Sequence, residues 1–148
     1  MDVAKLQLLS TRCWTWSLHA NQAYLGRIVL SLRRDCQGSL ADLTDVEWEA
    51  LRTELTAYEE IARDLFRPDR FNYKQLGNEW PHVHVHAIPR YRSSRRWNDV
   101  EFVDHRWGQD PYPDVDSPLT ADETYRLAEW MRQRIVQDGR YARMNNPA

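Results

Sequence analysis

Apolar and polar residues alternate over two short segments in the first third of the chain. Residues 14–18 (WTWSL) place an apolar side chain at every second position, which is typical of a strand with one buried face. Residues 26–33 (GRIVLSLR) resume the same alternation. Because Asn21 and Gln22 supply a polar connection between the two segments, we expect the segments to form a β-hairpin.

Two longer segments have the three- and four-residue spacing of amphipathic helices. Residues 44–47 (TDVE) form a capping box, in which the Thr and Glu side chains each bond the other's backbone amide. The apolar residues that follow recur every three or four positions until Pro68, so we expect a helix of about five turns. A second capping box at residues 120–123 predicts a helix over about 121–138, with Gly139 as its C-terminal stop.

Further strands are expected between these two helices. Residues 71–76 (FNYKQL) predict a short strand, and residues 81–88 (PHVHVHAI) alternate strictly and predict another, which Pro89 should end. A weak strand is expected at 100–103, and the prolines of 108–118 predict an extended loop. The order of strands, helix, strands and helix predicts an α+β fold: an antiparallel sheet with one long helix packed on it and a C-terminal helix.

Composition narrows the class of protein. A length of 148 residues predicts a single domain over 1–148, and 42% hydrophobic with 28% charged residues excludes a disordered chain. The sequence contains no apolar run of the roughly 18 residues that a membrane span needs, and a net charge of −2 predicts neither a nucleic-acid nor a membrane partner. The two cysteines make no disulfide framework, so we expect a reducing, cytoplasmic location.

Three histidines carry the candidate chemistry. His82, His84 and His86 recur at every second position of a predicted strand, so their side chains should share one face of it. The residues between them are apolar and should pack beneath the long helix. Burying three imidazoles in a core would leave polar atoms unbonded at about 1–3 kcal/mol each. We therefore expect a functional site.

Three functions are compatible with this pattern. In a straight strand the Cβ atoms of His82 and His86 lie roughly 13 Å apart. Ligand nitrogens on zinc are only about 3.4 Å apart, so the triad alone cannot hold a metal, although a neighbouring pair with a distant ligand can. A neutral imidazole can instead attack phosphorus and form a phosphoramidate that water cleaves. The third alternative is a site that binds phosphate without turnover.

The histidine segment resembles a known family. Residues 82–88 (HVHVHAI) match the signature of the histidine triad (HIT) family at every position. In this signature single hydrophobic residues separate three histidines, and two hydrophobic residues follow the third histidine. The likeness covers roughly residues 14–104, whereas 105–148 are an unmatched extension. It also includes the segments 21–30, 71–72, 77–79 and 89–91.

The resemblance implies an activity and roles for the triad. Members of the family hydrolyse or transfer nucleotidyl groups, usually as homodimers whose sheets join. By this analogy His84 is the nucleophile that forms a nucleotidyl-histidine, and His82 lines the site and holds the orientation of the nucleophile. His86 contacts the α-phosphate and the leaving group. No protein-bound cofactor or metal is implied, although Mg²⁺ can accompany a polyphosphate substrate.

The resemblance also suggests residues that bind the substrate. Asn72 stands at the position of a family amide side chain, and Asn78 should face the phosphate. Arg90 begins an arginine run that extends to residue 96 and could clamp a polyphosphate. Asn21, in the first hairpin, is the fourth candidate. The roles of His19 and His105 and the choice between base stacking and burial for Trp14, Trp16 and Trp80 stay open.

Two departures from the family bear on the substrate. Arg27 stands where many members have a further histidine, and Glu79 stands where one branch has a serine that helps protonate the leaving group. Because arginine is always charged, the arginine run favours an anionic leaving group and makes a dinucleoside polyphosphate hydrolase our best hypothesis. A nucleotide-binding regulatory protein without turnover is the alternative.

Overall fold

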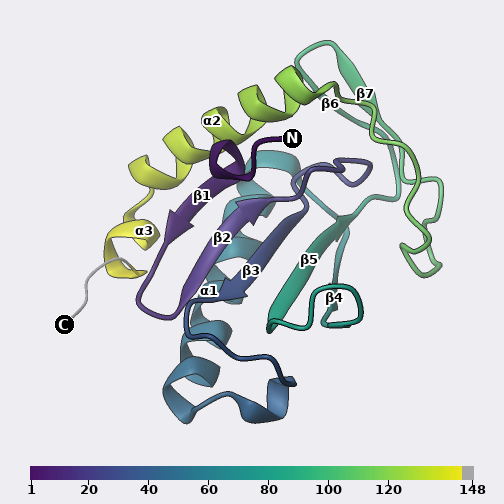
Figure 1. Cartoon of the computed structure of the whole chain (residues 1–148). Coiled ribbons are helices and arrows are strands. Elements are labelled where there is room, and N and C mark those ends of the chain that lie inside the picture. Colours follow the sequence, from purple (N-terminus) through teal and green to yellow (C-terminus); the bar gives the residue numbers. More distant parts are fainter. Residues whose placement is uncertain (145–148) are drawn as a thin grey trace.

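The computed structural model describes residues 1–144, and within them the core is a five-stranded antiparallel sheet (Figure 1). The strand order is β1-β2-β3-β5-β4. The strands are β1 (Gln7–Ser10), β2 (Trp14–Leu18), β3 (Ile28–Leu32), β4 (Arg70–Lys74) and β5 (His84–Arg90). The hairpin predicted from the alternating segments is confirmed, since β2 and β3 pair in register from Trp14 opposite Leu32 to Leu18 opposite Ile28.

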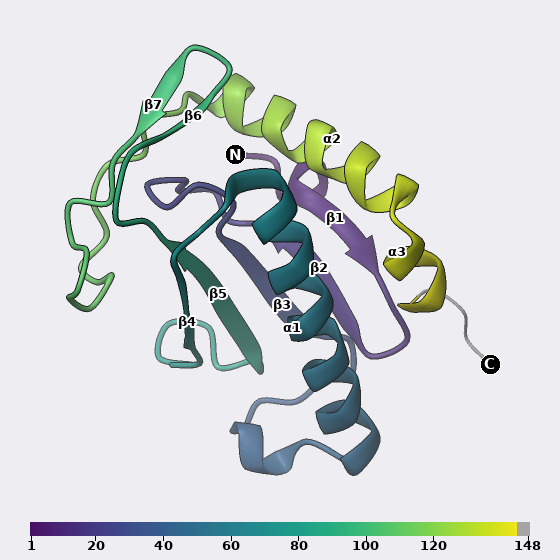
Figure 2. The same ribbon diagram turned by 180° about the vertical axis from the view of Figure 1, so that it is seen from behind.

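Helices cover one face of the sheet. The long helix α1 (Asp45–Phe66) crosses this face, and α2 (Ala121–Gln137) lies beside β1 (Figure 2). The smaller elements are η1 (Val3–Leu6), η2 (Leu40–Asp42), the hairpin of β6 (Arg95–Trp97) and β7 (Val100–Phe102), and α3 (Gly139–Met144). The predicted α+β architecture is confirmed, and both capping boxes form, at Thr44 with Glu47 and at Thr120 with Glu123.

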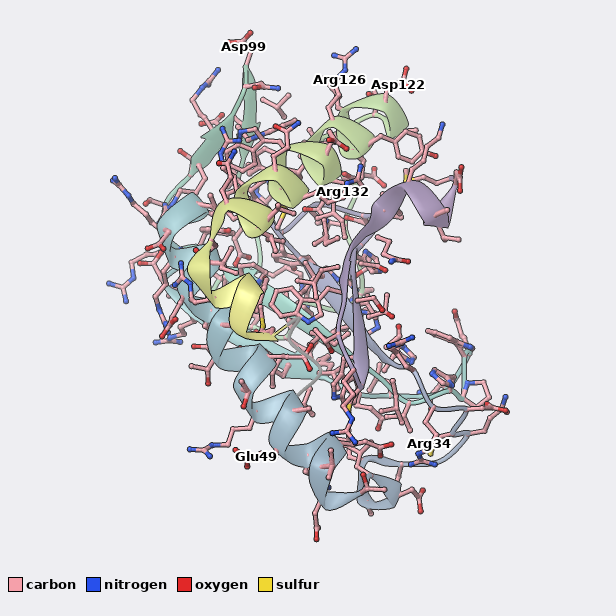
Figure 3. The ribbon with its side chains drawn as sticks, turned by 90° about the vertical axis from the view of Figure 1, so that its left-hand side faces the viewer. Arg34, Glu49, Asp99, Asp122, Arg126 and Arg132 are labelled. Atoms are coloured by element: carbon pink, nitrogen blue, oxygen red, sulfur yellow. The ribbon has the colours of Figure 1, made fainter. Side chains whose placement is uncertain are left out.

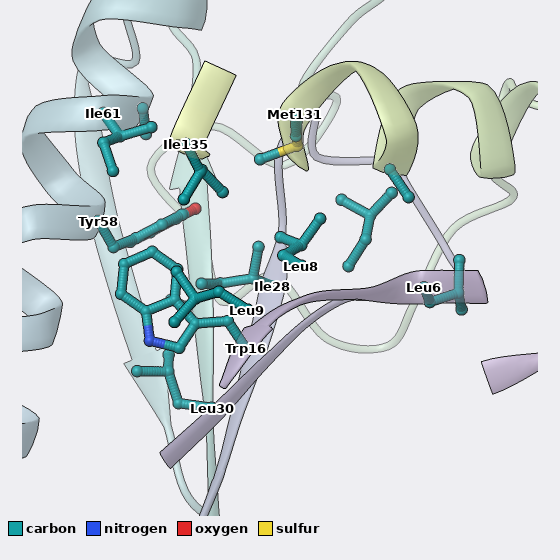
Figure 4. Close-up of a cluster of buried hydrophobic side chains, with 14 of the residues drawn as sticks. Leu6, Leu8, Leu9, Trp16, Ile28, Leu30, Tyr58, Ile61, Met131 and Ile135 are labelled. Atoms are coloured by element: carbon teal, nitrogen blue, oxygen red, sulfur yellow. The ribbon is translucent and has the colours of Figure 1, made fainter. Parts of the chain in front are cut away.

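The hydrophobic core lies between the helices and the sheet. Trp16 and Ile28 from the strands meet Tyr58 and Ile61 of α1 and Met131 of α2 (Figure 4). Charged side chains point outward from the same helices, as Figure 3 shows for Glu49 on α1 and for Asp122 and Arg126 on α2. Arg132 of α2 instead donates to the backbone carbonyls of Lys5 and Gln7 in the N-terminal segment. Within residues 1–144, no helix is both long and apolar enough to cross a membrane.

Some predicted boundaries are wrong. The triad strand begins at His84 rather than Pro81, and it continues through Pro89 to Arg90. Pro89 is tolerated because the ladder between β3 and β5 ends where Ile28 pairs with Ala87, so no amide is needed from Pro89 on that side.

Gly139 does not close the C-terminal helix as expected, because α2 ends at Gln137 and Gly139 opens α3. The predicted extension ends in residues 145–148, which lie outside the described residues.

Residues 108–118 contain neither helix nor strand, as predicted. This segment lies on the β4–β5 side of the sheet in both ribbon views (Figures 1 and 2).

Candidate active site

The site lies on the face of the sheet that the helices leave uncovered. Val85 and Ala87 of β5 point into the core, so the alternation turns His84 and His86 to the opposite face. There the two histidines line a cleft of about 540 Å³. Its walls come from the hairpin between β2 and β3, the turn before β5 and the 103–120 segment: His19, Arg27, Leu76, Gly77, Asn78, Glu79, Trp80, Tyr112, Pro113 and Asp114.

His84 is held by a backbone carbonyl. Its Nδ1 lies 2.7 Å from the carbonyl oxygen of His82, and its side chain is almost fully buried. A carbonyl oxygen can only accept a hydrogen bond, so Nδ1 of His84 must carry the proton. In the uncharged ring, Nε2 then has a free lone pair. A nucleophilic histidine attacks through such an unprotonated nitrogen.

His82 lies outside the strand, and the expectation that all three histidines share one strand is wrong for it. It precedes β5, where the chain approaches the end of β3. Its Nε2 donates to the carbonyl oxygen of Leu32 over 2.6 Å, and its Nδ1 is 3.9 Å from a carboxylate oxygen of Asp35. His82 thus anchors the backbone whose carbonyl orients His84, while its ring lies outside the cleft lining.

His86 has the opposite hydrogen-bonding pattern. Its Nδ1 is 3.3 Å from Nη2 of Arg27, and because a guanidinium can only donate, Nδ1 must accept. The proton of the uncharged ring is therefore on Nε2. Burial first, and then the charge of Arg27, lower the pKa of His86 to about 3.

The ring of Trp80 packs against the first two histidines of the triad, His82 and His84. Its ring is stacked on His82 with centroids 5.0 Å apart, and its centroid is 4.7 Å from that of His84. Half of its surface is exposed, at 50%. Trp14 and Trp16, by contrast, are fully buried in the core, which excludes them as stacking platforms.

A histidine outside the triad, His19, is the third imidazole of the cleft. The ring of His19 is 5.5 Å from that of His86, and burial together with the charge of Arg27 lowers the pKa of His19 to about 4. His19 follows β2, and its amide donates to the carbonyl of Arg27 at the start of β3. The sequence pointed to His19 only indirectly: many members of the family have a further histidine at the position of Arg27, and Arg27 is the residue that pairs with His19 across the hairpin. His105 is exposed and lies apart from the cleft lining.

The predicted substrate-binding residues separate into two groups. Asn78 and Glu79 line the cleft and are exposed. Asn72 and Arg90 instead border a separate pocket of about 140 Å³. Asn21 holds the hairpin turn, where its Nδ2 donates to the carbonyl of Val115 and its Oδ1 accepts from the amide of Ala23.

The arginine run does not face the cleft, which corrects the argument drawn from it. Arg90 is buried and paired with the fully buried carboxylate of Asp104, and it also donates to Asn72. Arg95 donates to backbone carbonyls, including that of Phe66. These guanidiniums bind the protein itself.

No group of three histidine, cysteine or acidic side chains within residues 1–144 is placed to hold a metal ion.

Comparisons with known proteins bear on the fold. Neither protein-family models nor curated proteins give a match. Among solved structures, a HIT protein from Sinorhizobium meliloti aligns with a TM-score of 0.70 at 16% identity, covering 86% of this chain and 87% of that one. A histidine triad protein from Marinobacter aquaeolei gives 0.67 at 20% identity, covering 89% and 93%.

A third structure with this fold is a named enzyme. The diadenosine triphosphate hydrolase of Plasmodium falciparum gives a TM-score of 0.62 at 15% identity, covering 93% of this chain and 80% of that one. The sequence signature and the sheet that carries it thus agree with each other. The chain has the fold of the histidine triad proteins.

Proposed function

We propose that this chain is a nucleotide phosphohydrolase or nucleotidyl transferase that acts at an α-phosphate through a nucleotidyl intermediate on His84. The observation that carries the proposal is the bond from Nδ1 of His84 to the carbonyl of His82, which leaves the lone pair on Nε2. The cleft supplies space for a phosphate beside that atom, and the fold is shared with a diadenosine triphosphate hydrolase.

The chemistry takes two steps. Nε2 of His84 attacks the α-phosphorus, a P–N bond forms, and the bond from phosphorus to the leaving group breaks. Nε2–H of His86 donates a hydrogen bond to a phosphoryl or bridging oxygen and stabilises the charge that develops there. Water, or an acceptor alcohol, then attacks phosphorus, and the P–N bond breaks to regenerate the lone pair of His84.

The state of His86 supports a leaving group that departs as an anion. Its low pKa means that His86 is uncharged at neutral pH, so it donates a hydrogen bond but has no extra proton to give away. An amine leaving group needs that proton, whereas a phosphate leaving group does not. The uncharged His86, rather than the arginine run, therefore supports a dinucleoside polyphosphate as substrate.

The cleft carboxylates add a requirement for a cation. Glu79 and Asp114 line the cleft beside a single guanidinium, that of Arg27, which is itself paired with Asp114. A polyphosphate therefore meets repulsion that Mg²⁺ bound to the substrate would offset. We expect polyphosphate cleavage to require Mg²⁺ supplied with the nucleotide.

The test compares substrates and traps the intermediate. We expect diadenosine polyphosphates with Mg²⁺ to be cleaved faster than adenosine phosphoramidates or a nucleotide sugar. His84→Ala should lower turnover by several powers of ten, while nucleotide affinity changes little. Mass spectrometry of the intact protein, quenched during turnover, should show an added nucleotidyl group that the variant lacks.

The matched control is His105→Ala, which removes an exposed histidine outside the cleft and should keep wild-type turnover. If His84→Ala keeps more than about a tenth of the rate, the assignment of His84 fails. Faster cleavage of phosphoramidates would reverse the proposed leaving group. Nucleotide binding without turnover of any substrate would favour the regulatory protein instead.

A further inference from the structure

Arg27 is the most deeply buried charged group beside the histidines. Its side chain is only 1% exposed, although it forms part of the wall of the cleft. Burying a guanidinium is costly unless it is paired and hydrogen-bonded. A residue at this depth has too little exposed surface to clamp a phosphate directly, so its role must lie in the groups that it contacts.

The guanidinium of Arg27 links two residues of the 103–120 segment to the ring of His86. Nη1 pairs with a carboxylate oxygen of Asp114 at 3.0 Å, and Nη2 donates to the hydroxyl of Tyr112 at 2.7 Å. The same Nη2 lies 3.3 Å from Nδ1 of His86. The 103–120 segment thus holds the guanidinium from one side, while the guanidinium fixes the orientation of His86 from the other.

We propose that Arg27 is a positioning and specificity-determining residue: it fixes His86 as an uncharged Nε2–H donor and so restricts the enzyme to leaving groups that depart as anions. A protonated His86 would need a hydrogen on Nδ1, directly opposite a guanidinium N–H. The guanidinium of Arg27 thus opposes protonation of His86 by its position as well as by its charge. The part of this inference that concerns leaving groups rests on the proposed function.

The other charged groups around His86 do not reverse this effect. His19, which follows β2, and His84 of β5 both face it, and as cations they would oppose its protonation further. Asp114 acts in the other direction, but its nearer partner is Arg27. Lys74 of β4 pairs with His86 in the strand register, and its ammonium bonds Asp110.

Nitrogen-15 NMR of the imidazole rings tests the inference without any substrate. In the unmodified protein, His86 should carry its proton on Nε2 and stay uncharged at pH 5. Arg27→Met should raise the pKa of His86 by roughly one unit or more and mix its two tautomers. If this variant fails to fold, Arg27→Gln, whose amide can still bond Tyr112, serves for the same measurement.

Arg106→Met is the matched control. Arg106 also bonds within the 103–120 segment, through Nε to the carbonyl of Asp110, but it lies apart from the cleft lining. It should leave the tautomer and pKa of His86 unchanged. An unmodified protein with the proton on Nδ1 of His86, or an Arg27 variant whose His86 behaves as in the wild type, would overturn the inference.

A kinetic measurement tests the part that concerns specificity. At pH 6 the ratio of polyphosphate to phosphoramidate turnover should fall by at least about tenfold in the Arg27 variant, because His86 can then act as a general acid. An unchanged ratio would contradict a role in specificity and would leave Arg27 only the structural role of holding the 103–120 segment. A protein without turnover would contradict the proposed function, while the NMR result would still decide the tautomer.

Discussion

At the level of single residues, the site combines groups that sequence spacing reveals with groups that it cannot reveal. The alternation at positions 82, 84 and 86 identified the triad, and two of these rings share the cleft. His19 and Arg27 were missed as cleft residues because they reach His86 across the sheet from another hairpin. Asp114 was missed because it lies in a segment with no periodic pattern.

A buried carboxyl outside the site makes a prediction about pH. Glu54 is 3% exposed, and its Oε1 accepts hydrogen bonds from Nε1 of Trp16 and the hydroxyl of Thr11. Burial raises its pKa to about 7, so the folded state favours the protonated form. The stability from this group is present below the unfolded pKa and is lost as pH rises through the folded one.

Replacing Glu54 by Gln should remove this loss. Relative to the wild type, the variant's free energy of unfolding should rise by about 2–3 kcal/mol between pH 5 and pH 8. Urea denaturation at the two pH values measures the difference. The low pKa values of His19 and His86 destabilise both proteins equally in acid, so they cancel in the comparison. A difference that does not change with pH would contradict the prediction.

At the level of elements, periodicity and capping predicted those with long or regular patterns. The β2–β3 hairpin, α1 and α2 form as expected, because each repeats its pattern over several residues and α1 and α2 begin with capping boxes. The strand β1 was missed because its four residues, QLLS, do not alternate. Its pairing with β2 and its contact with α2 stabilise it instead.

The cap of α1 can be tested with two variants in one helix. Thr44 accepts a hydrogen bond from the amide of Glu47, whose carboxylate bonds back to the amide of Thr44 and also pairs with Arg34. Thr44→Ala should lower the free energy of unfolding by about 1 kcal/mol. Thr56→Ala, an exposed change inside the helix, should cost nothing, since alanine is the better helix former. Equal losses in chemical denaturation would disprove a specific capping effect.

At the level of the whole molecule, the two faces of the sheet have separate tasks. The helices bury one face and form the core, while the other carries the cleft between the hairpin loop, the turn before β5 and the 103–120 segment. The sequence predicted this division from the apolar residues between the histidines. It did not predict that the unmatched segment supplies a wall of the cleft, because nothing local connects residue 112 with residue 27.

The edge of the sheet at β4 favours a homodimer, in line with the family resemblance. Within residues 1–144, β4 ends the sheet and pairs with β5 alone, so one side of its backbone is open to another strand. Tyr73 on β4 and Trp48 on α1 are large exposed apolar groups, and Glu59 connects them, since it bonds Tyr73 and lines the same surface hollow as Trp48. We expect light scattering to give about twice 17.7 kDa. The mass of one chain over a wide concentration range would contradict a dimer.

The two cleft histidines of β5 differ in which kind of group sets their tautomer, and therefore in whether a substitution elsewhere can change it. The acceptor that sets the tautomer of His84 is a peptide carbonyl, which every amino acid at position 82 would supply. The donor that sets the tautomer of His86 is a side chain, and it exists only while position 27 is arginine. If the proposed roles hold, the tautomer of His84 depends on the position of a backbone carbonyl, whereas the leaving-group preference depends on which side chain stands at position 27. On the proposed roles, a single substitution at position 27 would change which leaving groups are accepted while all three histidines of the triad stay in place.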